Sequence, residues 1–513
     1  MTGGVEDKDA EEGVPTGSAV TGSAPPQRSL GVRAMRGAGS VMAGQAARVV
    51  LQVGSVAVLS RLLAPRDYGL LAMVMVVVGL GEAFRDFGLS TAAIRAPSLT
   101  KGQRDVLFWL NCALGAGFAA LLALVAPLVA MWFRQPELVG MARWLALVFL
   151  LNGAVAQYRA GLNRSMRFNA LVASDLLGML FGIVVAVVMA LTGWGYWALV
   201  GQQLGTGVGV LVLAVIYSRW LPGLPRRGTK VGSMVKFGMN MSATQLVGYV
   251  NNNVDTIVVG SFLGVVPLGL YNRGYQLLMR AVNQFRGPTT TIALPVLSRL
   301  ETREQNDRFI VQGQLALGYS LVAGLAFCAA AAVPIIDIFL GQQWAEVAPI
   351  FALLAVAAIF QTTAYVGYWI YLSRGLTKHL LGYTLIGVAL RVGCILAGLP
   401  FGIIGVAAGF ALSDALSWPV SIWWLSRFTP MPVRALYGGA ARVLGLAAVS
   451  GVASNLLIRQ LGGWPSIAQI AVGLLAALAS YGLAMLIFPR VRSEVLDLFR
   501  LFLRAWRPRA AKS

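Results

Sequence analysis

Two sets of polar side chains lie inside apolar segments, at spacings that place each set along one side of a helix. The first set is Gln45, Arg48, Gln52 and Ser55. The second set, 200 residues further along, is Gln245, Tyr249, Asn252 and Asp255. We predict that both sets line one hydrophilic cavity, where they would hydrogen-bond a polar ligand. The alternative role of the amides is to hold neighbouring helices together.

Six arginines fall inside the predicted spans, and four of them, apart from Arg85 and Arg391, lie in segments where they could meet a polar ligand or the interface. They are Arg48 in the first set and Arg273, Arg280 and Arg286 in a later segment that contains no Asp or Glu. An arginine within a membrane is costly unless it meets water, an anion or a polar partner. The guanidinium group is a rigid fork of N–H donors that matches phosphate oxygens in pairs. We therefore predict a phosphate-bearing ligand for Arg48, Arg280 and Arg273, and expect Arg286 to reach the membrane interface.

Acidic side chains inside apolar segments suggest coupling to an ion. Glu82, Asp175, Asp255 and Asp414 are in such positions. A carboxylate in a low-dielectric interior needs a proton, a cation or a basic partner. Glu82 and Asp255 are the predicted sites for H⁺ or Na⁺. The single histidine and the three separated cysteines form no catalytic or metal-binding pattern, so we expect no enzymatic activity, metal or cofactor.

The elements that carry these residues must be membrane helices. Of 513 residues, 57% are hydrophobic and only 12% are charged, which is atypical of a soluble globular protein. The composition predicts an all-α polytopic membrane protein with about 14 transmembrane helices. The predicted spans are 37–60, 68–94, 107–133, 139–158, 168–191, 194–217, 238–260, 267–295, 309–333, 346–372, 379–399, 402–425, 436–458 and 466–488.

The distribution of basic residues predicts the orientation. With the N-terminus placed inside, 29 of the 41 Lys and Arg residues lie in or beside the cytoplasmic connections, and 5 lie in the opposite ones. This asymmetry follows the positive-inside rule, and it accounts for most of the net charge of +21 without a nucleic-acid partner. Both termini are expected in the cytoplasm. All exterior loops are short, so function must lie within the bundle.

A shift of 200 residues aligns the first helix pair of each half. It brings Gln45 onto Gln245 and Gly69 onto Gly269. Six predicted helices separate the copies, so the halves should have the same orientation, as in a parallel repeat with a substrate path between two lobes. Chance similarity between apolar segments is the alternative. The predicted organisation is a disordered cytoplasmic tail (1–36), an N-lobe (37–218), a basic cytoplasmic linker (219–237), a C-lobe (238–425), a C-terminal helix pair (426–488) and a basic amphipathic segment (489–513).

Several short stretches resemble a known family. They are RLLAPRDYGL at 61–70, FRDFGLSTA at 84–92, RSMRF at 164–168, YNRGYQ at 271–276 and ALPVLSRL at 293–300. With them the chain resembles the polysaccharide transport family of the MOP flippase superfamily, near the Wzx-type exporters of lipid-linked oligosaccharides. The resemblance implies two six-helix lobes around a central cavity. It also implies that an undecaprenyl-diphosphate-linked repeat unit passes from the inner to the outer leaflet of the bacterial inner membrane by alternating access.

The expected partners are the lipid-linked oligosaccharide and the bilayer, with polysaccharide polymerase or export machinery as a further candidate. A multidrug or cation antiporter of the same superfamily is the first alternative. Intramembrane arginines speak against it, since a cationic drug favours an acidic, aromatic cavity. A membrane glycan polymerase is the second alternative, and the short exterior loops speak against that.

Overall fold

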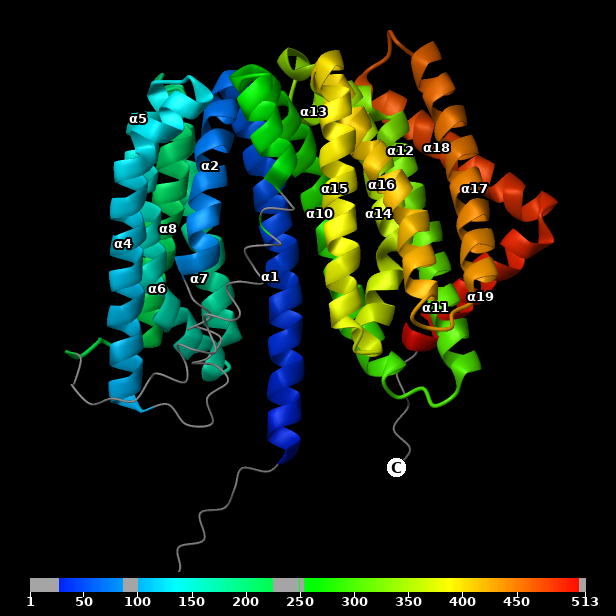
Figure 1. The fold of residues 1–513 in the computed structure, drawn as a ribbon, viewed down its shortest axis with the longest axis horizontal. Coiled ribbons are helices and arrows are strands. Elements are labelled where there is room, and N and C mark those ends of the chain that lie inside the picture. The colour runs from blue at the N-terminus through cyan, green and yellow to red at the C-terminus, as the bar shows by residue number, and fades with distance from the viewer. Residues whose placement is uncertain (1–26, 86–99, 225–248, 250–252, 507–513) are drawn as a thin grey trace, which may run out of the picture.

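In this computed structural model, residues 27–85, 100–224, 249 and 253–506 are described, without some of their side chains. Every regular element in these ranges is helical. Figure 1 shows two helix bundles side by side, with α1 between them. The prediction of an all-α polytopic protein built from two lobes is therefore confirmed.

The N-lobe is formed by the first seven labelled helices. Among them α7 packs against α8 and α1, and α6 packs against α4 and α8. Short loops join most of them, so the helices on either side of such a loop run antiparallel, whereas α5 and α6 together form one apolar segment. Their bounds are α1 Gln27–Leu62, α2 Pro65–Arg85, α4 Lys101–Phe133, α5 Glu137–Leu145, α6 Leu147–Arg164, α7 Phe168–Leu191 and α8 Trp197–Ser218.

The C-lobe begins in the described part with a helix over residues 253–262. Its centre is α14, which packs against α10, α12 and α16. Helices α17 and α18 pair with each other outside the repeat, on the side of α11 and α12. The bounds are α10 Val265–Leu297, α11 Arg303–Leu317, α12 Ala323–Ala330, α13 Ala332–Phe339, α14 Val347–Ser373, α15 Thr377–Gly398, α16 Gly402–Ser426, α17 Val433–Gln460, α18 Ser466–Ile487 and α19 Pro489–Trp506.

Ten segments of the described chain are long and apolar enough to cross a membrane. One of them, Lys378–Ser426, contains both α15 and α16. Helices α2 and α10 are less apolar, and they lie against each other where the two lobes meet. Large apolar side chains such as Leu124 and Leu486 are exposed on the outside of the bundle, as expected of a surface that faces lipid.

The contact between α2 and α10 has two-fold character. A Cβ atom on Gly69 would lie 1.8 Å from the carbonyl oxygen of Val265, and a Cβ atom on Gly269 would lie 1.9 Å from that of Pro65. Pro65 and Val265 are themselves 200 residues apart, so each half makes the same contact with the other. Only glycine permits this approach of two backbones. The sequence repeat thus corresponds to a structural one.

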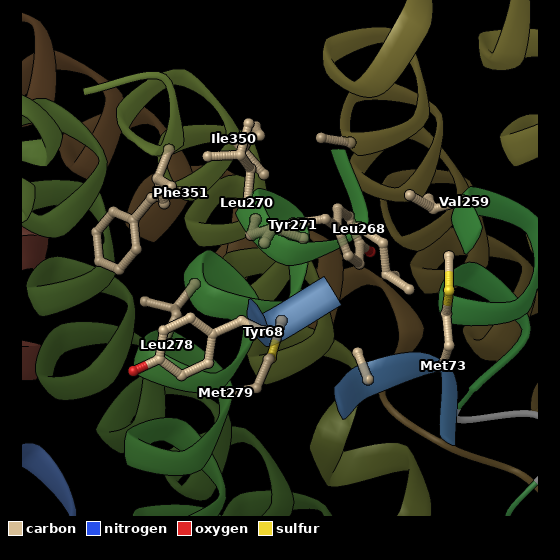
Figure 2. Packing of buried hydrophobic residues seen from close by; sticks show 14 of the residues in the cluster. Tyr68, Met73, Val259, Leu268, Leu270, Tyr271, Leu278, Met279, Ile350 and Phe351 are labelled. Atoms are coloured by element: carbon tan, nitrogen blue, oxygen red, sulfur yellow. The ribbon is translucent and has the colours of Figure 1, made fainter. Parts of the chain in front are cut away.

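Apolar side chains on both sides of this contact form one continuous core. Figure 2 shows Tyr68 and Met73 of α2 among Leu268 and Tyr271 of α10, with Phe351 of α14 to one side. Met73 and Tyr271 are fully buried. Burial of this kind stabilises the contact between the lobes at this end of the molecule.

The expected tail boundary at residue 36 is wrong, because α1 begins at Gln27. Arg, Ala, Met and Leu occur in residues 27–36 and all favour a helix, so the basic composition of this stretch does not prevent one. Two predicted spans are interrupted. The span at 139–158 is divided between α5 and α6, and the span at 309–333 contains a π-helical turn at Gly318–Val322 between α11 and α12.

The basic amphipathic segment predicted after residue 488 contains the helix α19. Its Glu494 attaches it to the C-lobe side of the protein. The carboxylate accepts a hydrogen bond of 2.8 Å from the hydroxyl of Tyr319 in the π-helical turn, and it forms an ion pair with Arg442 of α17.

Candidate functional site: a cavity between the lobes

A cavity of about 990 Å³ lies between the lobes. It is lined by α1, α2, α6, α7 and α8 of the N-lobe, and by Tyr249, Asn253, Thr256 and α10 of the second half. Most of the lining comes from the N-lobe. A volume of this size lies at the upper end of what small-molecule sites in proteins enclose.

The lobes are joined at one end of the cavity, near the C-terminus of α1. The carbonyl oxygen of Ser60 accepts a hydrogen bond of 2.7 Å from Trp344 Nε1, and Arg61 donates to the carbonyl oxygen of Ile338 at 3.0 Å. The glycine contact between α2 and α10 lies at the same end. We call it the sealed end.

The main charged feature of the cavity is a cluster of Arg48, Asp175 and Arg159. Arg48 Nη2 lies 2.8 Å from Asp175 Oδ2, and Arg159 Nη2 lies 3.1 Å from the same oxygen. Arg159 Nη1 pairs with Asp175 Oδ1. Both arginine side chains are 37% exposed, whereas the aspartate is 14% exposed. The cluster has one positive charge in excess and displays guanidinium groups towards a wet cavity.

Close packing of three helices positions this cluster. Gly44 of α1 lies against Val172 of α7, where a Cβ atom would come within 2.2 Å of the valine Cγ1. A short turn with Met166 in the left-handed region (φ 54°) connects α6 to α7. Arg159 near the end of α6 and Asp175 near the start of α7 are therefore brought together, and α1 adds Arg48 beside them.

Arg273 of α10 lies at the sealed end of the cavity. Its guanidinium carbon is 3.3 Å from the centre of the Tyr68 ring of α2, which is a cation–π contact between the lobes. The residue is 7% exposed and lines the cavity. Arg273 and the pair Arg48 and Arg159 thus border the same cavity, but in different surroundings.

Three residues of the first predicted set line the cavity: Arg48, Gln52 and Ser55. Ser55 accepts a hydrogen bond of 2.9 Å from Gln202 of α8. Of the second set, Tyr249 lines the cavity and donates a hydrogen bond of 2.9 Å to the carbonyl oxygen of Val76 in α2.

The second set is displaced from the predicted register. Asn253 and Thr256 line the cavity, whereas Asp255 is directed into the C-lobe. Asp255 is 3% exposed and accepts a hydrogen bond of 2.8 Å from the Tyr271 hydroxyl. Spacing alone identified a polar helix face but not how that face is rotated against its neighbours. Gln245, Asn252 and the side chain of Arg280 lie outside the described residues.

Gln45 and Glu82 do not line the cavity. Gln45 is exposed, and its Nε2 donates a hydrogen bond of 2.5 Å to Gln284 Oε1 of α10, across the two lobes. Glu82 accepts a hydrogen bond of 3.0 Å from Asn152, a residue that does line the cavity. Gln45 lies one turn of α1 before Arg48, on the side away from the sealed end, and its role as a glycan contact stays a prediction.

Arg286 does not reach the interface as expected. It is 6% exposed and donates to Gln361 Oε1 at 3.0 Å and to Thr362 Oγ1 at 2.6 Å. Gln361 in turn donates to Asp414 Oδ2 at 2.6 Å, and Arg391 donates to Asp414 Oδ1 at 2.9 Å. Polar partners within the C-lobe make burial possible, so this arginine has no need of the membrane surface.

Sequence reasoning did not select Arg159 as a site residue, because it lies near a helix end and was counted among the cytoplasmic basic residues. A usable signal was present. The turn between α6 and α7 is short, Arg159 lies towards the end of α6 and Asp175 lies about two turns into α7, so the two helices run antiparallel with these residues at similar heights. Opposite charges in such positions can pair.

Comparison with known sequences matches residues 58–349, more than half of the chain, to a family described as polysaccharide biosynthesis protein. The teichuronic acid biosynthesis protein TuaB of Bacillus subtilis is 26% identical over 381 residues, which cover 72% of this chain and 77% of TuaB. The lipopolysaccharide biosynthesis protein WzxC of Escherichia coli is 23% identical over 315 residues, covering 60% of this chain and 63% of WzxC.

Solved structures with the same fold are membrane transporters. The lipid II flippase MurJ in an inward closed conformation superposes with a TM-score of 0.64 at 14% identity, covering 88% of this chain and 98% of MurJ. An inward-facing multidrug resistance transporter of the MATE family in the MOP superfamily gives 0.56 at 15% identity, covering 76% of this chain and 95% of that transporter. At these identities the likeness establishes the fold alone.

Proposed function

Because this chain belongs to the polysaccharide biosynthesis protein family, whose model covers residues 58–349, we propose that it flips a lipid-linked oligosaccharide. The substrate would be an undecaprenyl-diphosphate-linked repeat unit, carried from the inner to the outer leaflet of the bacterial inner membrane. The protein is a transporter and not an enzyme. Polysaccharide polymerase or export machinery would receive its product.

The observation that carries this proposal is the cluster of Arg48, Asp175 and Arg159 in the cavity between the lobes. A diphosphate linkage carries negative charge at the junction of lipid and sugar. Guanidinium groups bind such oxygens strongly in a water-filled cavity bordered by low dielectric. Arg273 is a further candidate towards the sealed end. Arg280, seven residues from Arg273 along α10, remains a candidate from its position in the sequence.

The sugar part would occupy the amide-lined region of the cavity. Gln52, Asn253 and Gln276 line it and provide donors and acceptors for hydroxyl groups. Gln245 and Asn252 keep their predicted role as glycan contacts. The lipid tail would stay in the bilayer and reach the cavity between the lobes.

Transport would proceed by alternating access. The basic loops lie at the end opposite the sealed end, as the positive-inside rule requires of the cytoplasmic side. We therefore place both termini in the cytoplasm, with the cavity available from the inner leaflet and closed to the outside. Opening the contact between α2 and α10 would release the substrate outwards.

Glu82 or Asp255 would couple this cycle to a proton or sodium gradient. Asp255 is buried beside the cavity-lining residues Asn253 and Thr256, and Glu82 is bonded to the cavity residue Asn152. A change of charge at either group would therefore be felt at the cavity. Glycan export that continues after both gradients are collapsed would exclude this step.

The alternative transporter is a multidrug or cation antiporter, which has the same fold. The cavity residues in the described part do not favour it. Arg48, Arg159 and Arg273 outnumber Asp175 there, so an organic cation would meet a field of the wrong sign.

Complementation of a deletion strain tests the proposed function. Arg48→Ala and Arg159→Ala should each reduce surface glycan and cause lipid-diphosphate oligosaccharide to accumulate on the inner leaflet. Arg303→Ala is the control, because Arg303 is 63% exposed and pairs with Asp307 on α11, outside the cavity. Normal surface glycan in both cavity variants, at normal protein levels, would refute the proposed binding site.

A further inference from the structure

The two guanidinium groups of the cavity cluster are already engaged by a protein carboxylate. Asp175 receives N–H groups from Arg48 Nη2 at 2.8 Å and from both terminal nitrogens of Arg159. A carboxylate and a phosphate present oxygens of similar spacing to an arginine fork. Asp175 therefore occupies the donors that a phosphate ligand would use.

This arrangement bears on selectivity, because the cavity borders a membrane full of phosphate groups. Ordinary phospholipids carry a single phosphodiester group, whereas a diphosphate-linked lipid carries two linked phosphate groups. Two free arginines in the cavity would bind either class. A binding site discriminates best when it also contains an element that opposes the wrong ligand.

We propose that Asp175 is a specificity-determining residue that a diphosphate displaces from Arg48 and Arg159 and that a single phosphate does not. This inference rests on the proposed function. A diphosphate brings two linked anionic groups to two guanidinium groups, so it can replace every bond that Asp175 makes. A single phosphate group offers one anionic centre, as does the carboxylate that is already in place, and gains little over it.

The packing around the cluster fits such an exchange. Asp175 is only 14% exposed and is fixed on α7, whereas the two arginine side chains are 37% exposed and reach the cavity. The long arginine side chains can turn towards a ligand without movement of the helix backbones. In the empty protein the carboxylate neutralises part of their charge, which limits repulsion between the two guanidinium groups.

Binding to purified protein in nanodiscs of zwitterionic lipid tests the proposal. Geranylgeranyl diphosphate and geranylgeranyl monophosphate serve as the two probes. The wild type should prefer the diphosphate. Asp175→Asn should bind the monophosphate about tenfold more tightly, equivalent to ~1.4 kcal/mol, so the preference falls. Added phosphatidylglycerol should then compete with the probes in the variant more than in the wild type.

Two controls accompany this measurement. Asp307→Asn makes the same chemical change at an arginine-paired aspartate on α11, outside the cavity, and should leave the preference unchanged. Asp175→Glu retains the charge and should retain the preference. A monodisperse elution profile checks that each variant is folded.

The outcomes separate the two proposals. Equal weakening of both probes by Asp175→Asn would show that Asp175 only positions the arginines, and an unchanged ratio would show that it has no part in selection. Either result overturns this inference and leaves the proposed function intact. A wild type that binds neither probe, or binds them no better than the Arg48→Ala variant, would overturn the proposed function as well.

Discussion

The two lobes contain charge clusters of the same composition in opposite surroundings. In the N-lobe, Asp175 pairs with Arg48 and Arg159 at the cavity, and both arginine side chains are 37% exposed. In the C-lobe, Asp414 pairs with Arg391, and Gln361 connects it to Arg286. There the side chains of Arg391 and Asp414 are 19% and 5% exposed.

Burial, and not residue type, therefore separates a binding site from an ion pair that only stabilises the fold. A guanidinium group that reaches water can exchange its protein partner for a ligand. One that is sealed among helices cannot, because breaking its ion pair leaves a charge in low dielectric. The C-lobe cluster joins α10, α14, α15 and α16. We therefore interpret it as a structural cluster that keeps this part of the C-lobe rigid while the N-lobe cavity binds the ligand.

The largest expected effect is on stability, and it compares the two aspartates directly. Asp414→Ala removes the buried partner of the mostly enclosed Arg391 and should destabilise the protein by about 3–5 kcal/mol. Asp175→Ala should cost less than ~1 kcal/mol, since its arginines can turn to water. Thermal unfolding of the purified variants in detergent measures both. Equal losses in the two variants would remove the distinction between the clusters.

A second comparison replaces arginine by lysine in each cluster. Arg159→Lys should lower the affinity for geranylgeranyl diphosphate about tenfold, because an ammonium group cannot make paired hydrogen bonds to phosphate. The unfolding temperature should hardly change. Arg391→Lys should do the reverse, lowering the unfolding temperature while leaving affinity in the folded protein as it was. Isothermal titration calorimetry measures the affinity, and thermal unfolding measures the stability of the same samples. A loss of affinity in Arg391→Lys would contradict the structural role of the C-lobe cluster.

The glycine contact should be symmetric where the charge clusters are not. Gly69→Ala and Gly269→Ala each place a methyl group within 2 Å of a backbone carbonyl of the opposite lobe, at 1.8 and 1.9 Å before any movement. Both variants should weaken the contact at the sealed end to a similar extent. The population of the state that is closed at this end should fall by a few-fold in each. Labelling of a cysteine placed at Leu63, a buried residue at that end, reports the change. A large effect in one variant alone would argue against the two-fold relation.

The fold was predictable because its determinants are local in the sequence. Hydrophobic runs of sufficient length predict the helices, and the positions of Lys and Arg predict their direction. The repeat could be read because Gly69 and Gly269 must both be glycine for the same steric reason. These features do not depend on how one helix is rotated against the next.

The site was less predictable because its geometry depends on that rotation. The spacing of Arg48, Gln52 and Ser55 indicated a polar face, and the structure places all three at the cavity. The same argument gave the wrong direction for Asp255, which faces the C-lobe interior. Arg159 was overlooked because its partner Asp175 is on another helix, and no pattern within one helix reveals such a pair.

The smallest expected effect is that of salt, and it distinguishes the clusters without any mutation. At an ionic strength near 1 M the screening length is ~3 Å, so attraction between exposed charges is strongly reduced while buried pairs are affected much less. Diphosphate affinity at the N-lobe cluster should therefore fall by a few-fold between low and high salt. The unfolding temperature of the ligand-free protein should change little, because the C-lobe cluster is closed to solvent ions.

The Asp175→Asn variant gives the clearest test, since its uncompensated arginines should show a steeper dependence of diphosphate affinity on salt than the wild type does. An affinity that is independent of salt would mean that the ligand is held by the amides and apolar residues of the cavity, and not by its arginines.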